Sequence, residues 1–159
     1  MNPSTAPSTL ALPPMTLPTA GRVLAAGVAG LAAWEVFARL VAPQIWGFGP
    51  EPTQLIEAAL GIGGIGAQVL HILTGLLFFP AFYLLVARPL ARAMMPVLPW
   101  WALALGYGIA LWVFAMYFMA SLLAGMPPFL EFGAVTWASL FGHLGLGLGI
   151  GAAAHFTDR

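Results

Sequence analysis

Four ionisable residues lie inside long apolar stretches of the sequence: Glu35, Arg39, His71 and His143. Ionisable side chains are costly within a bilayer and commonly serve binding, proton transfer or ion transfer there. Glu35 and Arg39 are four residues apart, so on a helix they are placed to form an ion pair. The four residues together are compatible with hydrogen bonding between helices, with a haem site, or with a proton or ion path.

The two histidines share a local pattern, because His71 is followed by Gly75 and His143 by Gly147, each at a spacing of four. This echo predicts a duplicated helical hairpin, with the two halves related by an axis along the membrane normal. A glycine one turn after each histidine would leave room beside the imidazole. Two neutral imidazoles on facing helices can hold a b-type haem, so His71 and His143 are the candidate haem ligands.

Depth within the membrane can be compared by counting about 1.5 Å per helical residue from the nearest span end. This count places Glu35, His71 and His143 in the same outer half of the bilayer. Gln68 and Tyr117 fall in the same layer. The expected polar cluster therefore consists of Glu35, Arg39, Gln68 and Tyr117, with the two histidines nearby.

The composition excludes several classes of protein. Hydrophobic residues make up 61% of the 159 residues and charged residues only 6%, whereas a soluble domain carries about 25% charged residues. The formal net charge is zero, which gives nucleic-acid binding no electrostatic basis. The chain has no cysteine, so disulfides, thiolate nucleophiles and cysteine metal sites are excluded. No metal site is predicted.

Four stretches reach the length of about 20 apolar residues that a membrane-spanning helix needs. They cover approximately residues 21–42, 65–87, 100–124 and 132–155. Backbone polar groups must be satisfied internally in hydrocarbon, and the apolar runs lack alternation, so helices are predicted rather than strands. The expected fold is an all-α, four-helix transmembrane bundle over residues 21–159. It is preceded by a proline-rich arm over residues 1–20 that is either extended on a partner or irregular.

Arginine placement predicts the orientation of the chain. Arg22, Arg88, Arg92 and Arg159 flank the spans on one side, while the other two loops carry glutamates and no basic residue. The positive-inside rule then places both termini in the cytoplasm. The abundance of alanine, glycine and proline, with arginine as the only basic residue besides histidine and no lysine, is typical of a high-GC bacterium. The expected location is therefore a bacterial inner membrane.

Small residues recur at packing intervals in the last span. Gly145 and Gly149 form one G-x-x-x-G pair, and Gly147 and Gly151 form another. Such pairs let helices approach closely, either within the bundle or against another protein.

The helical hairpins with His71/Gly75 and His143/Gly147 resemble small four-helix bacterial inner-membrane proteins of the YagU-like type. The resemblance covers about residues 21–156. It implies a fold and no particular reaction.

The functional expectation follows from small size, little mass outside the membrane and the absence of catalytic motifs such as H-E-x-x-H or G-x-S-x-G. We expect a non-catalytic accessory subunit of a respiratory or photosynthetic inner-membrane complex, in contact with lipids and other integral-membrane subunits. No cofactor is expected in that role, although lipid or quinone binding is compatible with it. The alternatives are a bis-histidine b-type cytochrome with His71 and His143 as ligands, and a small transporter or channel.

Overall fold

A computed structural model describes residues 16–157 of the chain, and over that range it contains helices and no strand. Four of its helical segments are long and apolar enough to cross a membrane. The predicted all-α, four-helix membrane fold is thus confirmed. A short additional helix, α3 (Pro52–Leu60), lies between the first two spans.

Each span is built from one or more helical elements in sequence order. The first span contains α1 (Leu17–Val36), η1 (Phe37–Val41) and α2 (Ala42–Trp46). The second contains α4 (Gly64–Leu73), η2 (Thr74–Phe78), α5 (Phe79–Phe82), η3 (Tyr83–Ala87) and α6 (Arg88–Met94). The third contains α7 (Trp100–Val113) and η4 (Phe114–Leu123), and the fourth is α8 (Ala134–Phe156).

The first two spans are longer than the sequence predicts. The first begins at Leu17, where the Thr16 side chain accepts a hydrogen bond from the Thr19 amide and caps the helix. Residues 17–20 of the expected arm therefore belong to α1, while residues 1–15 lie outside the described part of the chain. The second span continues through Pro89 to Met94, beyond the expected end at residue 87.

Prolines explain why these helices continue. Three five-residue π-helical segments, η1, η2 and η3, each end two residues before a proline: Pro43, Pro80 and Pro89. A proline ring clashes with the carbonyl four residues earlier and offers no amide proton. The wider π turn moves that carbonyl aside, so the helix crosses the proline instead of ending.

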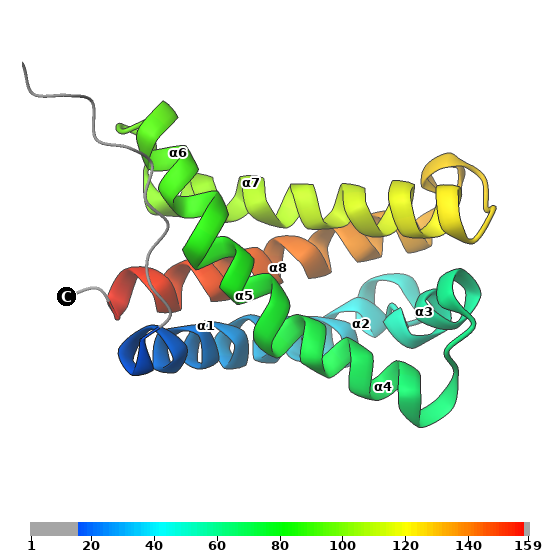
Figure 1. The fold of residues 1–159 in the computed structure, drawn as a ribbon. Helices are drawn as coiled ribbons and strands as arrows, with labels where there is room; N and C mark the ends of the chain where they lie inside the picture. Colours follow the sequence, from blue (N-terminus) through cyan, green and yellow to red (C-terminus); the bar gives the residue numbers. More distant parts are fainter. Residues whose placement is uncertain (1–15, 158–159) are drawn as a thin grey trace, which may run out of the picture.

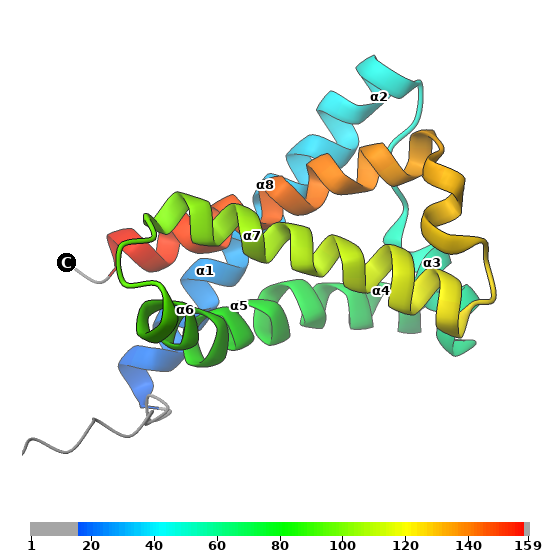
Figure 2. The same cartoon turned by 90° about the horizontal axis from the view of Figure 1, so that it is seen from above.

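The four spans differ in their packing partners and in their burial within the bundle (Figures 1 and 2). The helix α8 packs along both α1 and α7, while the second span crosses this layer diagonally over α1. Among the four spans, α8 is the most buried and the second span the least. A duplicated hairpin would give these two helices matching positions, so the expected symmetry between the halves is not seen.

Apart from Arg39, which pairs with Glu35, the charged residues among residues 16–157 separate by sign to opposite ends of the bundle. The start of α1, α6 and the end of α8 lie together at one end, which carries Arg22, Arg88 and Arg92 and is called the arginine end below. The opposite end contains α2, α3 and η5 (Pro128–Phe132), and is called the glutamate end. Its acidic residues are Glu35 near the end of α1, with Glu51, Glu57 and Glu131 in the connecting segments.

Two loops close the glutamate end. The loop before α3 folds back over the first span at Gly49, where a Cβ would lie 2.2 Å from the Ala38 carbonyl oxygen. In the loop before α8, residues Phe129 to Phe132 all have positive φ, between 48° and 56°. The buried Thr136 hydroxyl donates to the Phe129 carbonyl at 2.5 Å and ties this left-handed turn to α8.

Candidate functional site

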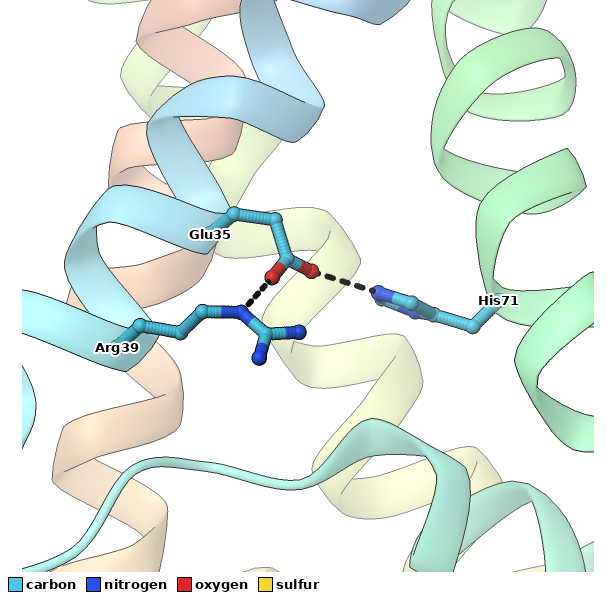
Figure 3. Close-up of polar contacts among 3 residues, drawn as sticks. All are labelled: Glu35, Arg39 and His71. Atoms are coloured by element: carbon cyan, nitrogen blue, oxygen red, sulfur yellow. Dashed lines mark hydrogen bonds and ion pairs between the residues drawn. The ribbon is translucent and has the colours of Figure 1, made fainter. Parts of the chain in front are cut away.

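Glu35 lies between Arg39 and His71 and contacts both (Figure 3). Arg39 Nε donates to Glu35 Oε2 at 2.5 Å along the same helical span. His71 Nε2 lies 3.7 Å from Glu35 Oε1, across the gap between the first and second spans. This second distance is longer than a hydrogen bond but lies within ion-pair range. The three residues therefore form one polar cluster that links two spans.

Exposure differs across this cluster. The side chain of Arg39 is 71% exposed and that of Glu35 is 32% exposed, whereas His71 is only 15% exposed. The guanidinium is thus at the surface, while the imidazole lies between helices. His71 Nε2 is buried and makes no hydrogen bond, so Glu35 is its nearest charged partner.

The other two expected members of the cluster have different places. Gln68 lines the same small cavity as Glu35, Arg39 and His71. Tyr117 is exposed on η4 and stacks on Phe129, with ring centroids 5.6 Å apart. The structure therefore brings together four of the expected polar residues and leaves Tyr117 outside the group.

Trp34 connects the two histidines. Its indole lies with ring centroids 4.9 Å from His143 in an edge arrangement and 6.3 Å from His71. His143 is buried, and its Nδ1 lies 2.8 Å from the Ser139 carbonyl oxygen. That contact is satisfied when Nδ1 carries the proton, which leaves Nε2 as the ring acceptor. The sequence reasoning did not select Trp34 as a site residue, because a tryptophan in an apolar span does not by itself indicate a contact with a histidine.

The glycines that follow the histidines serve helix contacts. A Cβ at Gly75 would lie 3.0 Å from Leu31 of α1, and one at Gly147 would lie 2.4 Å from the Ala104 carbonyl of α7. These glycines allow neighbouring helices to approach, so the expected role of leaving room beside the imidazoles is not what the structure shows.

The glycine pairs of α8 face two different helices within the chain. A Cβ at Gly149 would lie 2.6 Å from the Ala29 carbonyl of α1, and one at Gly145 would lie 3.8 Å from that of Ala33. On the other side, Gly147 and Gly151 lie against Ala104. These four glycines therefore face neighbouring helices inside the bundle.

Two cavities adjoin the polar cluster at the glutamate end. One of about 50 Å³ is lined by the cluster itself together with Thr53 and neighbouring loop residues. A larger one of about 420 Å³ extends under α3, and Ser139 and Met116 line it. Trp34 lines both cavities. The larger cavity thus lies beside the cavity that the charged groups line, and the Trp34 indole contributes to the walls of both.

A third hollow, the lateral groove, lies between the second span and α7. It measures about 710 Å³, and the residues that line it are almost all apolar. Small residues occur one turn apart on both walls, with Ala87 and Ala91 on one side and Gly106 and Ala110 on the other. The sequence contains this small-xxx-small spacing, but only the fold shows that both pairs face the same groove.

Among residues 16–157, no group of three or more His, Cys, Asp or Glu side chains is arranged to hold a metal ion. Comparisons with protein-family models, curated proteins and solved structures found no match. The resemblance to YagU-like proteins therefore stays a prediction.

Proposed function

We propose that this chain is a non-catalytic accessory subunit of a larger respiratory or photosynthetic assembly in a bacterial inner membrane. It binds a transmembrane helix of a neighbouring subunit in the lateral groove and stabilises that neighbour. Both termini face the cytoplasm, as the arginine distribution predicts.

The lateral groove is the observation that supports this proposal. Its walls carry the pairs Ala87/Ala91 and Gly106/Ala110, which lower the surface enough for a helix backbone to approach. Large apolar side chains stand beside these pairs, including Phe82, which is 54% exposed. Close helix packing in a membrane relies on this combination of small contact residues and dispersion contacts, whereas lipid chains need no such spacing.

The polar cluster supports a structural role for the charged groups. Glu35 contacts Arg39 on its own span and His71 on the next span, so the three groups largely compensate one another. The His143 imidazole is likewise engaged with the Ser139 carbonyl. In this proposal, these contacts hold the outer halves of the helices together rather than act on a substrate.

Filling the groove tests this function. A Cβ at Gly106 meets no atom within 4 Å, so Gly106→Leu occupies the groove without a clash in its own backbone surroundings. We expect this variant to fold, and to lose the stoichiometric partner that co-purifies with the tagged wild-type chain in mild detergent. Native mass spectrometry measures the ratio of partner to chain.

The matched control is Gly21→Leu. Gly21 also sits in an exposed helical position with open space around its Cβ direction, but it lies on α1 and does not line the groove. We expect this variant to keep the partner. A wild-type chain that is monomeric in several mild detergents would contradict the proposal, and so would equal partner retention by the two variants.

A b-type cytochrome is the second candidate, and His143 favours it. A buried imidazole whose Nδ1 faces a carbonyl has its Nε2 oriented as a metal ligand commonly is. In this candidate His71 supplies the second ligand. A reduced-minus-oxidised spectrum of chain produced with ample haem should then show a Soret difference that His143→Ala removes and His155→Ala, at the arginine end, preserves. Absence of that difference in the wild-type chain rejects the cytochrome.

A further inference from the structure

The larger cavity at the glutamate end has the size of a small-molecule site. It measures about 420 Å³, and pockets that bind small molecules commonly measure about 300–1,000 Å³. It is bounded by the loop before α3 and by residues of α3, η4 and α8. No residue of the described range lines both this cavity and the lateral groove, so a ligand here is independent of the proposed partner site.

The charge around this cavity excludes one class of ligand. Among residues 16–157, Glu51 is the only charged residue that lines it. The three other glutamates of the described chain lie at the same end of the bundle, where Arg39 is the only arginine. The local field is therefore negative and disfavours an anionic group such as a phosphate or a fatty-acid carboxylate. A ligand of this cavity is thus neutral or cationic.

Ser139 brings a buried hydroxyl to the cavity wall. The residue is 3% exposed, and its Oγ lies 3.3 Å from His143 Nδ1. The same Nδ1 lies 2.8 Å from the Ser139 carbonyl oxygen, so Nδ1 carries the proton and the hydroxyl oxygen accepts from it. The proton of the hydroxyl itself then has no acceptor among residues 16–157. A buried donor without an acceptor is unfavourable, so this position favours a ligand oxygen that accepts a hydrogen bond.

Gln54 supplies a second donor to the same cavity, because the exposed side-chain amide of this α3 residue also lines it. The remaining lining is mostly apolar and includes the buried side chains of Trp34 and Met116. Indole and thioether groups make favourable contacts with a flat ring. The cavity therefore favours a flat ring that carries acceptor oxygens at two separate positions. An organic cation could approach Glu51, but it would leave the Ser139 proton without an acceptor.

A para-quinone has this chemistry, because its two carbonyl oxygens accept hydrogen bonds at opposite edges of a flat, uncharged ring. We propose that this cavity binds the headgroup of a membrane quinone. The Ser139 hydroxyl donates to one carbonyl, the Gln54 amide donates to the other, and the Trp34 indole contacts the ring. The cavity lies beside α3 at the end of the apolar spans, at the depth where the polar part of a membrane-dissolved amphiphile lies (Figure 1).

Binding of menadione, a para-quinone without a long tail, by the purified full-length chain tests the proposal. Equilibrium dialysis against micelles of the same detergent measures the excess of menadione that each chain binds. Methylnaphthalene is the matched control, because it has the same fused rings and no carbonyl oxygen. We expect saturable binding of menadione, and we expect methylnaphthalene to bind at least about fivefold more weakly because it forms neither hydrogen bond.

Variants identify the cavity as the site. Ser139→Ala removes the hydroxyl and Gln54→Leu removes the amide, so each should weaken menadione binding by about two- to tenfold. Gln44→Leu, in α2, and Thr74→Val, in η2, remove the same kinds of group from residues that do not line the cavity. Both controls should bind menadione as the wild-type chain does. Because Gln54 is exposed, Gln54→Leu still decides the matter if Ser139→Ala does not fold.

Three results would overturn this site. Equal affinity of the wild-type chain for menadione and methylnaphthalene would show that the carbonyl oxygens are not recognised. Unchanged menadione affinity in both Ser139→Ala and Gln54→Leu would place any bound quinone elsewhere. Displacement of menadione by an equal concentration of tetraphenylphosphonium, abolished in Glu51→Gln, would identify an organic cation as the ligand.

Discussion

The indole of Trp34 packs edge-on against the imidazole of His143, with ring centroids 4.9 Å apart. This contact depends on Gly142, because a Cβ there would lie 2.7 Å from the same indole. A missing side chain on α8 thus makes room for a large aromatic side chain from α1 beside a buried histidine. The same arrangement recurs along α8, where glycines of this helix lie against a side chain or the backbone of a neighbouring helix.

The clearest test of this packing compares two glycines of α8. In Gly147→Ala the new methyl group would lie 2.4 Å from the Ala104 carbonyl oxygen, so α7 and α8 must separate. Overpacking of this kind typically costs about 1–3 kcal/mol. We expect a clear fall in the melting temperature of the detergent-solubilised chain, measured by intrinsic fluorescence.

Gly145→Ala is the control for that substitution. Its methyl group would lie 3.8 Å from the Ala33 carbonyl oxygen, which is an ordinary contact distance. Alanine is favoured over glycine in a helix by about 1 kcal/mol. The melting temperature should therefore stay the same or rise, and equal losses in the two variants would show that α8 does not pack as described.

The fold class could be predicted because membrane spans depend on length and hydropathy, which are local properties of the chain. The helix α3 was likewise predictable, since Pro52 suits a first turn and Gly61 takes the left-handed conformation that ends it. Span ends were less predictable. The expected first and second spans ended at residues 42 and 87, just before Pro43 and Pro89, but π turns before these prolines let the helices continue.

Residue counting can compare the depths of the candidate site residues along their spans. It cannot tell toward which neighbour each side chain points. Counting residues from the span ends puts Glu35, His71 and Gln68 in one layer, and in the structure these three residues line one cavity. The same count included Tyr117, which faces outward from η4. The rotation of a nearly all-apolar helix leaves little trace in its sequence, because lipid and protein interior favour similar side chains. For the same reason, the lateral groove could not be predicted.

A double-mutant cycle should detect coupling between Glu35 and His71. The two side chains approach across spans to 3.7 Å, and polar contacts between membrane helices contribute about 0.6 kcal/mol on average. We expect Glu35→Gln and His71→Gln together to destabilise the chain less than the sum of the single effects. Thermal unfolding of the four proteins in one detergent measures this difference.

His155 provides the reference for that cycle, because it lies near the end of α8 at the arginine end. Glu35→Gln and His155→Gln should have additive effects, as expected for distant residues. Coupling of similar size in both cycles would mean that the effect arises from the detergent or the denatured state and not from the observed contact.

The left-handed turn before α8 predicts that a glycine would stabilise it. Glu131 is exposed and has φ of 55°, a conformation that costs a residue with a side chain about 1–2 kcal/mol. Glu131→Gly relieves that cost and should raise the stability by about 1 kcal/mol, after allowance for the flexibility of glycine in the unfolded chain.

Glu57→Gly is the matched substitution, because Glu57 is exposed within the regular helix α3. Glycine in a helix is unfavourable, so this variant should lose about 0.5–1 kcal/mol. The two melting temperatures should thus move in opposite directions. A fall in both would show that residue 131 does not hold a left-handed conformation in the folded protein.

The last prediction concerns the hydroxyl that holds this turn to α8. Thr136 is fully buried, and its Oγ1 donates to the Phe129 carbonyl. Thr136→Val keeps the size of the side chain but leaves that carbonyl without its donor, which typically costs about 1–3 kcal/mol for a buried group.

Thr157→Val removes a similar bond, from Thr157 Oγ1 to the Ala153 carbonyl, at an exposed helix end. It should change the stability by no more than about 0.5 kcal/mol.

Because the Thr136 bond fixes the loop over the larger glutamate-end cavity, Thr136→Val should also increase proteolysis of the chain near residue 129. A variant that keeps the wild-type melting temperature and cleavage pattern would show that the turn is held by its backbone alone.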